Sequence, residues 1–533
     1  MMSIMLKLIQ KQLDTKLVKI ALIFAFIYCL LFNSSVLIYK FDYYKISVFR
    51  ACIELFKDFI YIYISLFIIF FGLTINRLLF IIGTIFLFIT GSVASYYLYC
   101  FKITPTKEMM EAFFCTDMNE AYELISTRLI VWMTFSLFIA IYTIKHFAVH
   151  GTKLFVTKLL SAVCIFIMIN NIISPQYKLL NSYFPIQYLH NSYLYIFKGT
   201  STSAKIDLNK KFSFQDNSSE GIIGILVIGE SARFDHFGIN GYERDTTPYL
   251  KNIENLFSFK AQSCSNVTHI SVPCMLSRHP TGNLSEMHNE TSLLSIFTRL
   301  NYNTSWVATQ SLLKYFKGLN PNTIYDDVNF TLLPGGSTLV KMNDHDGIMI
   351  PYIQNIIANN NSKKQFLVIH TSGSHWNYVS RYPENFQKFN PDCNYKGKVD
   401  FSKADPSSCS HEGLINTNDN SILYTDFFLH SVISILKDKN AFLIYASDHA
   451  ESLGENGRYG HGGDSVIEQT TIPLIVWFSD KFQINNEEVK VAVNSHMNTE
   501  LNHDYIFHSV LDCMGISSEI VDKNLSLCKL SNG

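Results

Sequence analysis

Five long apolar runs lie in the first third of the chain, and they constrain its fold more than any other feature of the sequence. Each approaches the ~20 residues with which an α-helix crosses the hydrocarbon core of a bilayer. Buried helices of a soluble domain are also apolar, but five such runs so close together favour membrane spans. We expect spans at residues 17–39, 58–74, 78–99, 127–146 and 154–174.

The composition agrees with this interpretation. Charged residues make up 16% of the chain, against about 25% in soluble proteins. The first run is too long for a signal-peptide core and lacks a small-residue cleavage site, so we interpret it as a retained anchor. The net charge of −1 provides no basic surface for nucleic acid, so we expect no nucleic-acid partner.

The cysteines divide the chain into two parts. Five lie in or beside the apolar region and six in the polar remainder, and an even set in local pairs is typical of disulfides. A reduced zinc site is the alternative, although no CxxC motif occurs. Basic residues divide almost evenly between the two sides of the spans, so they do not fix the orientation. Disulfides form outside the cytoplasm, and an odd number of spans places the six polar-region cysteines there: Cys264, Cys274, Cys393, Cys409, Cys513 and Cys528.

Three regions follow one another along the chain. Residues 1–175 form the predicted transmembrane domain, in which the amphipathic stretch 100–126 is expected to lie along the outer face of the membrane. Residues 176–220 combine an aromatic stretch that suits the headgroup layer, read as interfacial helices, with a polar linker. Residues 221–533 form the predicted catalytic α/β domain.

This last region alternates short apolar, β-branched runs with helical patterns. The alternation predicts a largely parallel sheet that helices cover on both faces. Active groups in such sheets collect beyond the carboxyl ends of the strands. The expected strands are 222–228, 365–370, 441–446 and 472–477, and the expected helices lie near 246–257, 287–300, 346–360, 418–438 and 502–514.

Three of these strands end in residues that could bind a cation. Glu230 follows the first strand, His375 follows the second, and Asp448 with His449 follows the third. Carboxylates and an imidazole at strand ends predict a site for zinc or manganese. An Asp-His pair alone is a weak signal, so the prediction depends on the convergence of the three strand ends. Ser231 is not in a GxSxG elbow, so we interpret it as structural.

One hydroxyl stands out in a stretch rich in Ser, Asn and Thr. Thr268 lies between Cys264 and Cys274, and a disulfide at this spacing would close a small ring around it. A threonine hydroxyl is a weak nucleophile until a base, a helix N-terminus or a metal ion activates it. Taken alone, the stretch is more typical of an ordinary polar loop.

Four blocks carry a resemblance: GESARFDHFGINGYERDTTP at 229–248, the Thr268 stretch that ends in SVPCM, HTSGSHW at 370–376, and SDHAESLGENGRYGHGG at 447–463. Together they resemble the membrane-bound phosphoethanolamine transferases that modify lipid A and the lipopolysaccharide core, including the mobile colistin-resistance type. The resemblance runs from the first span to near the C-terminus. The family has five transmembrane helices and a periplasmic alkaline-phosphatase/sulfatase-like domain.

The resemblance implies an enzyme of the bacterial inner membrane that transfers phosphoethanolamine from phosphatidylethanolamine to lipopolysaccharide. The acceptor in the family is a lipid A phosphate or a core Kdo or heptose. The family uses one tightly bound Zn²⁺, with a second as an alternative, and we expect a monomer whose catalytic domain lies in the periplasm.

The zinc ligands of the family match four residues of this chain, with Thr268 also the nucleophile that becomes modified. Zinc lowers the pKa of a bound oxygen, so this hydroxyl could act as an alkoxide near neutral pH. Two displacements at one threonine predict ping-pong kinetics. The four residues are Glu230, Thr268, Asp448 and His449.

Five further residues match the family pattern. Lys314 lies eight residues after Trp306, as the family lysine does, and would offset charge on the phosphoryl group. His375 and His461 match histidines that contact this group or bind an additional zinc. The mouth of the donor-lipid site in the family matches Thr116 and Glu120.

The chain also departs from the family pattern. Ala112 stands where the family often has an asparagine, which changes the expected contact with the donor headgroup, and Ala450 replaces a glycine beside a metal ligand. A family disulfide near 320–345 is absent, and Cys513 and Cys528 could supply a different pair.

Two other functions remain open at this point. A phosphoglycerol transferase of the lipoteichoic-acid-synthase kind resembles the same architecture, but it uses manganese and lacks this cysteine set. The metal and the donor headgroup would separate it from the transferase. A catalytically inactive, membrane-anchored binding protein would require a broken site, whereas all four matched ligands are present.

Overall fold

The chain forms two compact units. The membrane unit comprises Met1–Glu111 and Ile125–Gly199, and the α/β unit comprises Ala112–Leu124 and Thr200–Gly533. The short segment Ala112–Leu124 therefore belongs to the α/β unit although it lies between two spans in sequence. The computed structural model describes residues 14–43, 47–116, 124–147, 154–174, 182–198, 206–279, 281, 290–310, 329–332, 345–359, 364–393 and 409–529.

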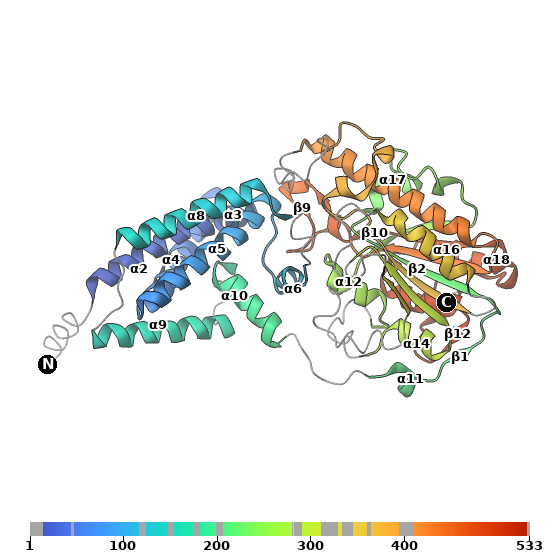
Figure 1. The fold of residues 1–533 in the computed structure, drawn as a ribbon, viewed down its shortest axis with the longest axis horizontal. Helices are drawn as coiled ribbons and strands as arrows, with labels where there is room; N and C mark the ends of the chain where they lie inside the picture. Colours follow the sequence, from blue (N-terminus) through green and yellow to red (C-terminus); the bar gives the residue numbers. More distant parts are fainter. Residues whose placement is uncertain are drawn as a thin grey trace. The chain divides into compact units, whose positions relative to one another are not determined.

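Five helices among the described residues of the membrane unit are long and apolar enough to cross a membrane (Figure 1). Polar side chains cap the first turns of three of them, because Asp14, Asn76 and Ser126 accept hydrogen bonds from backbone N–H groups there. The first span joins α2 (Thr15–Tyr28), a π-helical turn (Cys29–Asn33) and α3 (Ser34–Tyr43), and the others are α4 (Val48–Leu73), α5 (Arg77–Phe101), α8 (Thr127–His146) and α9 (Phe155–Ile173). Shorter helices in this part of the chain are α6 (Lys107–Cys115) and α10 (Ile186–Tyr193), which continues into a π-helical turn (Leu194–Lys198).

Buried polar contacts tie α10 and the residues before it to the first and third spans. The Tyr188 hydroxyl lies 3.1 Å from the hydroxyl of Tyr28 and 2.8 Å from Oγ1 of Thr90. Asn33 donates to the carbonyl of Phe184 at 3.0 Å and accepts from its N–H at 2.9 Å. Such pairs hold helices together in a bilayer, where no water is present to satisfy the polar groups.

Among the described residues of the α/β unit, eight strands form a central sheet in the order β11-β3-β10-β7-β2-β6-β4-β5. Strand β10 runs antiparallel to both of its neighbours, and the other pairings are parallel. The strands are β2 (Ile223–Gly229), β3 (Leu256–Gln262), β4 (Asn303–Ala308), β5 (Asn329–Leu332), β6 (Gln365–His370), β7 (Ala441–Ser447), β10 (Thr471–Phe478) and β11 (Leu501–Asn502). Two small ribbons pair β1 (Gln215–Asp216) with β12 (Ile516–Ser517), and β8 (Ser452–Leu453) with β9 (Tyr459–Gly460).

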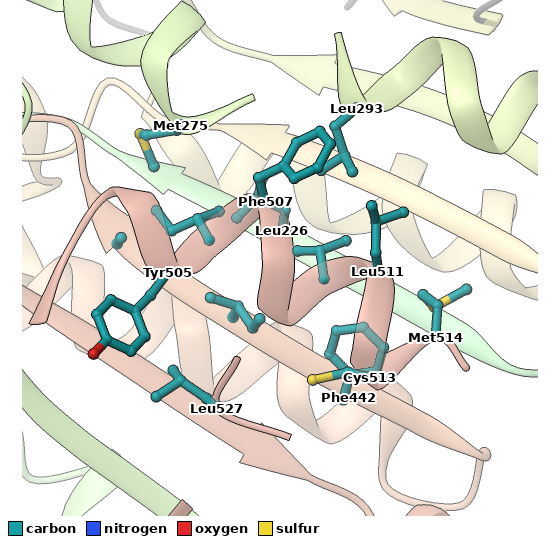
Figure 2. Packing of buried hydrophobic residues seen from close by; sticks show 14 of the residues in the cluster. Leu226, Met275, Leu293, Phe442, Tyr505, Phe507, Leu511, Cys513, Met514 and Leu527 are labelled. Atoms are coloured by element: carbon teal, nitrogen blue, oxygen red, sulfur yellow. The ribbon is translucent and has the colours of Figure 1, made fainter. Parts of the chain in front are cut away.

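Helices cover both faces of this sheet, because strand side chains alternate between the faces. Helices α16 and α17 pack on one face, as Figure 1 shows, against residues such as Ile225. Leu226 points to the other face, where Met275, Leu293 and Leu511 meet it in a second cluster (Figure 2). Burying one such leucine stabilises the fold by roughly 1.5–3 kcal/mol. The helices are α11 (Leu208–Lys211), α12 (Thr268–Met275), α14 (Leu293–Arg299), α16 (Ile350–Ala358), α17 (His411–Leu436), α18 (Asp480–Asn485), α19 (Val489–Ser495) and α20 (Asp504–Cys513).

The predicted fold class is confirmed: five apolar helices precede a largely parallel α/β unit. The helix predicted at 246–257 is wrong. Only a 3₁₀ turn (Leu250–Asn252) forms there, and β3 already begins at Leu256. Phe257, Phe259 and Ala261 alternate toward one face of the sheet, and β3 pairs with β10 along seven residues.

Three disulfides join cysteines of the α/β unit, Cys264–Cys274, Cys393–Cys409 and Cys513–Cys528. They include all six cysteines of the polar part of the chain. Four described cysteines of the membrane unit are free thiols, namely Cys29, Cys52, Cys100 and Cys164.

Candidate active site

The ends of two neighbouring strands bring three predicted ligands together. Strands β2 and β7 run parallel, and their last residues, Gly229 and Ser447, pair directly. Glu230 therefore lies beside Asp448 and His449, which follow β7. The side chains are fully buried, and one ligand atom from each lies within 4.8 Å of the others.

Thr268 reaches this group from the start of α12. Its Oγ1 lies 3.1 Å from Nε2 of His449 and 3.3 Å from Oε1 of Glu230. The Cys264–Cys274 disulfide closes the loop around it. The first N–H groups of a helix have no partner within the helix and favour negative charge, so this position suits an oxygen nucleophile and a bound phosphoryl group.

The polar atoms of this group fit a divalent cation. Nδ1 of His449 lies 3.1 Å from the carbonyl of Ala450, which can only accept, so Nδ1 carries the proton and Nε2 has a lone pair. This Nε2 lies 3.3 Å from Oε1 of Glu230 and 3.4 Å from Oδ2 of Asp448. Oδ2 of Asp448 is buried without a hydrogen-bond partner.

The electrostatics of these ligands also favour a bound divalent cation. Burial and the neighbouring charge of Glu230 raise the pKa of Asp448 well above its usual range. Two carboxylates so close together cannot both ionise at low cost without a positive charge. A divalent cation among the three ligands would remove this conflict.

A second group consists of His375, His461 and Glu230, whose ligand atoms also lie within 4.8 Å of one another. Nδ1 of His461 lies 3.1 Å from the carbonyl of Asn266, and Nδ1 of His375 contacts the carbonyl of Trp376. Both rings therefore carry their proton on Nδ1, and their Nε2 atoms face each other at 3.4 Å. A shared proton or a cation would relieve the repulsion between the two lone pairs.

The structure thus brings together Glu230, Thr268, Asp448, His449 and the two predicted histidines. Thr116 follows α6, and its hydroxyl donates to the carbonyl of Ala112 at 2.8 Å. Lys314 and Glu120 lie outside the described residues. Ser231, interpreted as structural, adopts a left-handed backbone conformation, and its hydroxyl donates to Glu230.

Sequence reasoning missed two residues that contact the site. Glu451 is buried, accepts from Ser231 Oγ at 3.1 Å and from the hydroxyl of Tyr378, and lies 3.8 Å from Nε2 of His461. Gln310 donates to Oε2 of Glu230 at 2.6 Å. Gln310 follows β4 by two residues, so the strand-end argument would have found it if that strand had been recognised.

A buried carboxylate shapes the loop that carries His375. Asp346 accepts from the N–H groups of Ser372 and Gly373 at 2.8 and 2.9 Å. Gly373 has a φ of +49°, and a Cβ on it would lie 2.6 Å from the carbonyl oxygen of Glu230. Only glycine fits here, because the loop passes directly over the residue that follows β2.

The fold and the site together define a class of protein. The family model described as Sulfatase matches residues 223–516, so the chain belongs to the sulfatase family. A second model, described as Phosphoethanolamine transferase EptA/EptB, matches residues 63–192. Within that broad family, the chain is similar to the membrane-bound phosphoethanolamine transferases, as its sequence blocks indicated.

Named relatives agree with this assignment. The chain is 30% identical over 353 residues to the Kdo(2)-lipid A phosphoethanolamine 7''-transferase of Salmonella typhimurium, which covers 63% of this chain and 60% of that protein. It is 33% identical over 307 residues to phosphoethanolamine transferase EptA of Helicobacter pylori, covering 56% and 54%. The chain thus spans about 60% or less of the length of these relatives.

One solved structure extends the likeness over nearly the whole chain. It is the integral membrane protein lipooligosaccharide phosphoethanolamine transferase A (EptA) from Neisseria meningitidis. The match has a TM-score of 0.77 and 25% sequence identity, and it covers 95% of this chain and 98% of that one. Both units of the fold therefore have counterparts in this relative.

Proposed function

We propose that this chain transfers phosphoethanolamine from phosphatidylethanolamine to lipopolysaccharide through a phosphoethanolamine–threonine intermediate on Thr268. Its relatives are named as phosphoethanolamine transferases. The observation that carries the proposal is the position of Thr268 Oγ1 at a helix start, 3.1 Å from His449 Nε2 and 3.3 Å from Glu230 Oε1. A base, a helix N-terminus or a metal ion can activate a threonine hydroxyl. Oγ1 of Thr268 lies at a helix start and beside two groups that could bind a metal ion.

The cation that fits this site is Zn²⁺ in our proposal. Its ligands would be Glu230, Thr268, Asp448 and His449, an oxygen and nitrogen set of the size that zinc prefers. When bound, zinc would lower the pKa of the threonine hydroxyl and polarise a phosphoryl oxygen. His375 and His461 would contact the phosphoryl group or hold a second zinc.

The reaction takes place in two displacements. Thr268 Oγ1 first attacks phosphorus, and the bond from phosphorus to the diacylglycerol oxygen breaks. The hydroxyl proton is lost from Thr268, and the leaving oxygen takes up a proton that a protonated His461 or His375 can donate from Nε2. An oxygen of the acceptor then attacks the same phosphorus, and Thr268 leaves and regains its proton. The kinetics should therefore be ping-pong.

The five apolar helices support this proposal, because both proposed substrates are lipids. We place the chain in the bacterial inner membrane as a monomer, with the α/β unit in the periplasm, where its three disulfides can form. The family pattern alone assigns Lys314 to the phosphoryl group, and Thr116 and Glu120 to the donor lipid. The acceptor oxygen is a lipid A phosphate or a Kdo or heptose hydroxyl of the core.

Replacing the nucleophile tests the proposal. In the full protein in detergent, Thr268→Ala should abolish diacylglycerol release from fluorescent phosphatidylethanolamine, because no oxygen remains to attack. Thr268→Ser is the matched control and should keep measurable activity, because it retains a hydroxyl. Mass spectrometry of lipopolysaccharide from producing cells, with lipid A and core fragmented apart, identifies the acceptor. Continued modification by Thr268→Ala would refute the mechanism.

A further inference from the structure

His503 connects two segments of the site that follow different strands, β3 and β7. It follows β11, its side chain is fully buried, and its own N–H donates to the carbonyl of Gln262 at 3.2 Å. Its Nδ1 accepts from the N–H of Cys264 at 3.1 Å. Its Nε2 lies 3.0 Å from the carbonyl oxygen of Ser447, so Nε2 carries the proton and donates it there.

The two hydrogen-bond partners of this imidazole each lie at the start of a segment that carries site residues. Cys264 opens the disulfide ring that presents Thr268, and Ser447 is the last residue of β7, directly before Asp448. Oγ of Ser447 also accepts from the N–H of Ala232 at 2.8 Å and donates to the carbonyl of His449 at 2.7 Å. Ser447 is therefore joined to the segments that follow both β2 and β7.

No strand pairing joins these two segments directly. Thr268 follows β3, whereas Asp448 follows β7, and β10 lies between the two strands in the sheet. The backbone ladders therefore relate the end of β3 to the end of β7 only through β10, and the segment from Cys264 to Thr268 lies beyond them. The bridge through His503 spans this gap with two hydrogen bonds from one rigid ring.

We propose that His503 is a positioning residue that holds the Thr268 ring at a fixed distance from the ligands Glu230, Asp448 and His449. This inference rests on the proposed function, because it assigns His503 to the same reaction. The residue does not touch the reacting atoms; it acts through Cys264 and Ser447. Small errors in the placement of reacting groups cost up to about 100-fold in rate.

The protonation state of the ring agrees with this role. One nitrogen must accept and the other must donate, which only the neutral imidazole can do. Burial lowers the pKa of His503 to about 4, so the ring is neutral over the physiological range. A positively charged ring would lose the hydrogen bond from Cys264.

A second contact limits the loss of activity that is expected when His503 is replaced. Asn266, in the same loop as Thr268, donates to Oε1 of Gln469 at 2.7 Å, and Gln469 in turn accepts the N–H of Ala450 through its carbonyl oxygen at 2.9 Å. This contact stays when His503 is replaced. We therefore expect a partial loss of activity and not a complete one.

The test compares three variants of the full protein in detergent. His503→Phe removes both hydrogen bonds, and His503→Gln can keep one of them. His508→Gln is the matched control: this buried histidine of α20 accepts from the N–H of Asp522 at 3.1 Å, in a segment that does not contain the site. Thermal unfolding of each variant is measured first, so that kcat is compared among folded proteins.

Two readouts decide the outcome. For diacylglycerol release, kcat should fall about 10- to 100-fold in His503→Phe and about tenfold in His503→Gln, with KM changed less than twofold. Zinc affinity, measured by chelator competition, should fall about tenfold in His503→Phe, because Thr268 is no longer held beside the other ligands. Both quantities should stay within twofold of the wild type in His508→Gln.

Either of two results would overturn the inference. One is a folded His503→Gln or His503→Phe protein whose kcat and zinc affinity stay within twofold of the wild type. The other is an equal loss in His508→Gln, which would show a general effect of a lost buried hydrogen bond. If the wild type binds zinc but releases no diacylglycerol, the proposed function fails, and the zinc measurement alone still decides the role of His503.

Discussion

The two units of the chain bury polar groups for opposite purposes. In the membrane unit, the neutral hydroxyls of Tyr28 and Thr90 each contact the hydroxyl of Tyr188. In the α/β unit, charged groups converge, and Oδ2 of Asp448 is left buried without a hydrogen-bond partner. The first arrangement is complete as it stands and holds helices together. The second would be completed by a cation, and this difference marks the candidate functional site.

The largest expected effect is the loss of a ligand. Asp448→Asn should lower kcat by more than about 100-fold. Replacing a residue that only supports a metal ligand costs up to about 100-fold, and the loss of a ligand itself should cost more. The metal-free protein should not become less stable, because burial and Glu230 already raise the pKa of this carboxyl and asparagine keeps the position neutral. Diacylglycerol release and thermal unfolding with and without zinc measure both effects. Full stabilisation of this variant by zinc would show that the cation does not bind here.

The pH dependence of unfolding should reveal the buried imidazole. The pKa of His503 is about 4 in the folded protein, against about 6.5 in an unfolded chain. Between these values the unfolded chain binds the extra proton, so stability is lost as the pH falls from about 6.5 to 4. The loss attributable to this residue is about 3 kcal/mol. Urea unfolding at several pH values measures it as the difference between the wild type and His503→Phe, and identical pH profiles would contradict it.

The disulfides allow a matched comparison within the α/β unit. Replacing both cysteines of Cys264–Cys274 or of Cys513–Cys528 by serine removes a link of similar length, 10 or 15 residues. Each should cost about 3 kcal/mol of stability. Only the first pair should also lower kcat, by about tenfold or more, because it holds the loop of Thr268. Equal kcat values for the two folded double variants would show that the ring does not position the nucleophile.

The smallest effect is expected in the membrane unit. Tyr28→Phe removes one of these three hydroxyls, while Tyr188 keeps its contact with Thr90. Hydrogen bonds between helices in a bilayer contribute about 0.6 kcal/mol on average, so the melting temperature should fall slightly. Diacylglycerol release should keep its kcat within twofold. A tenfold loss of kcat would contradict the comparison, because it would show that this hydroxyl of the membrane unit does more than hold helices together.

The sequence predicted the strands that are apolar throughout. Strands β2, β6, β7 and β10 are buried on both faces, and continuous apolar runs identify them. Strand β4 (NTSWVA) contains Asn, Thr and Ser, and β3 (LFSFKAQ) mixes in Ser, Lys and Gln, so neither produced an apolar run. Helix α12 follows a stretch rich in Ser, Asn and Thr and contains Pro273, and that polar composition is typical of a loop.

Residues that follow a recognisable strand were found, and the others were not. Glu230, Asp448 and His449 follow β2 and β7, and topology alone brings them together. Gln310 follows the unrecognised β4, and His503 follows β11, a strand of only two residues. Their contacts depend on the packing of distant segments, which no local pattern of the sequence encodes.

The segment Ala112–Leu124 has a consequence for recombination between relatives. It belongs to the α/β unit, where Leu124 packs against the cluster formed by Trp376, Tyr378, Leu414 and Leu453. A hybrid that exchanged the chain only after Gly199 would take this cluster from one parent and the residue at position 124, which packs against it, from the other. Chimeric enzymes built on this scaffold therefore need three crossover points, after Glu111, Leu124 and Gly199, for the exchanged unit to be inherited whole.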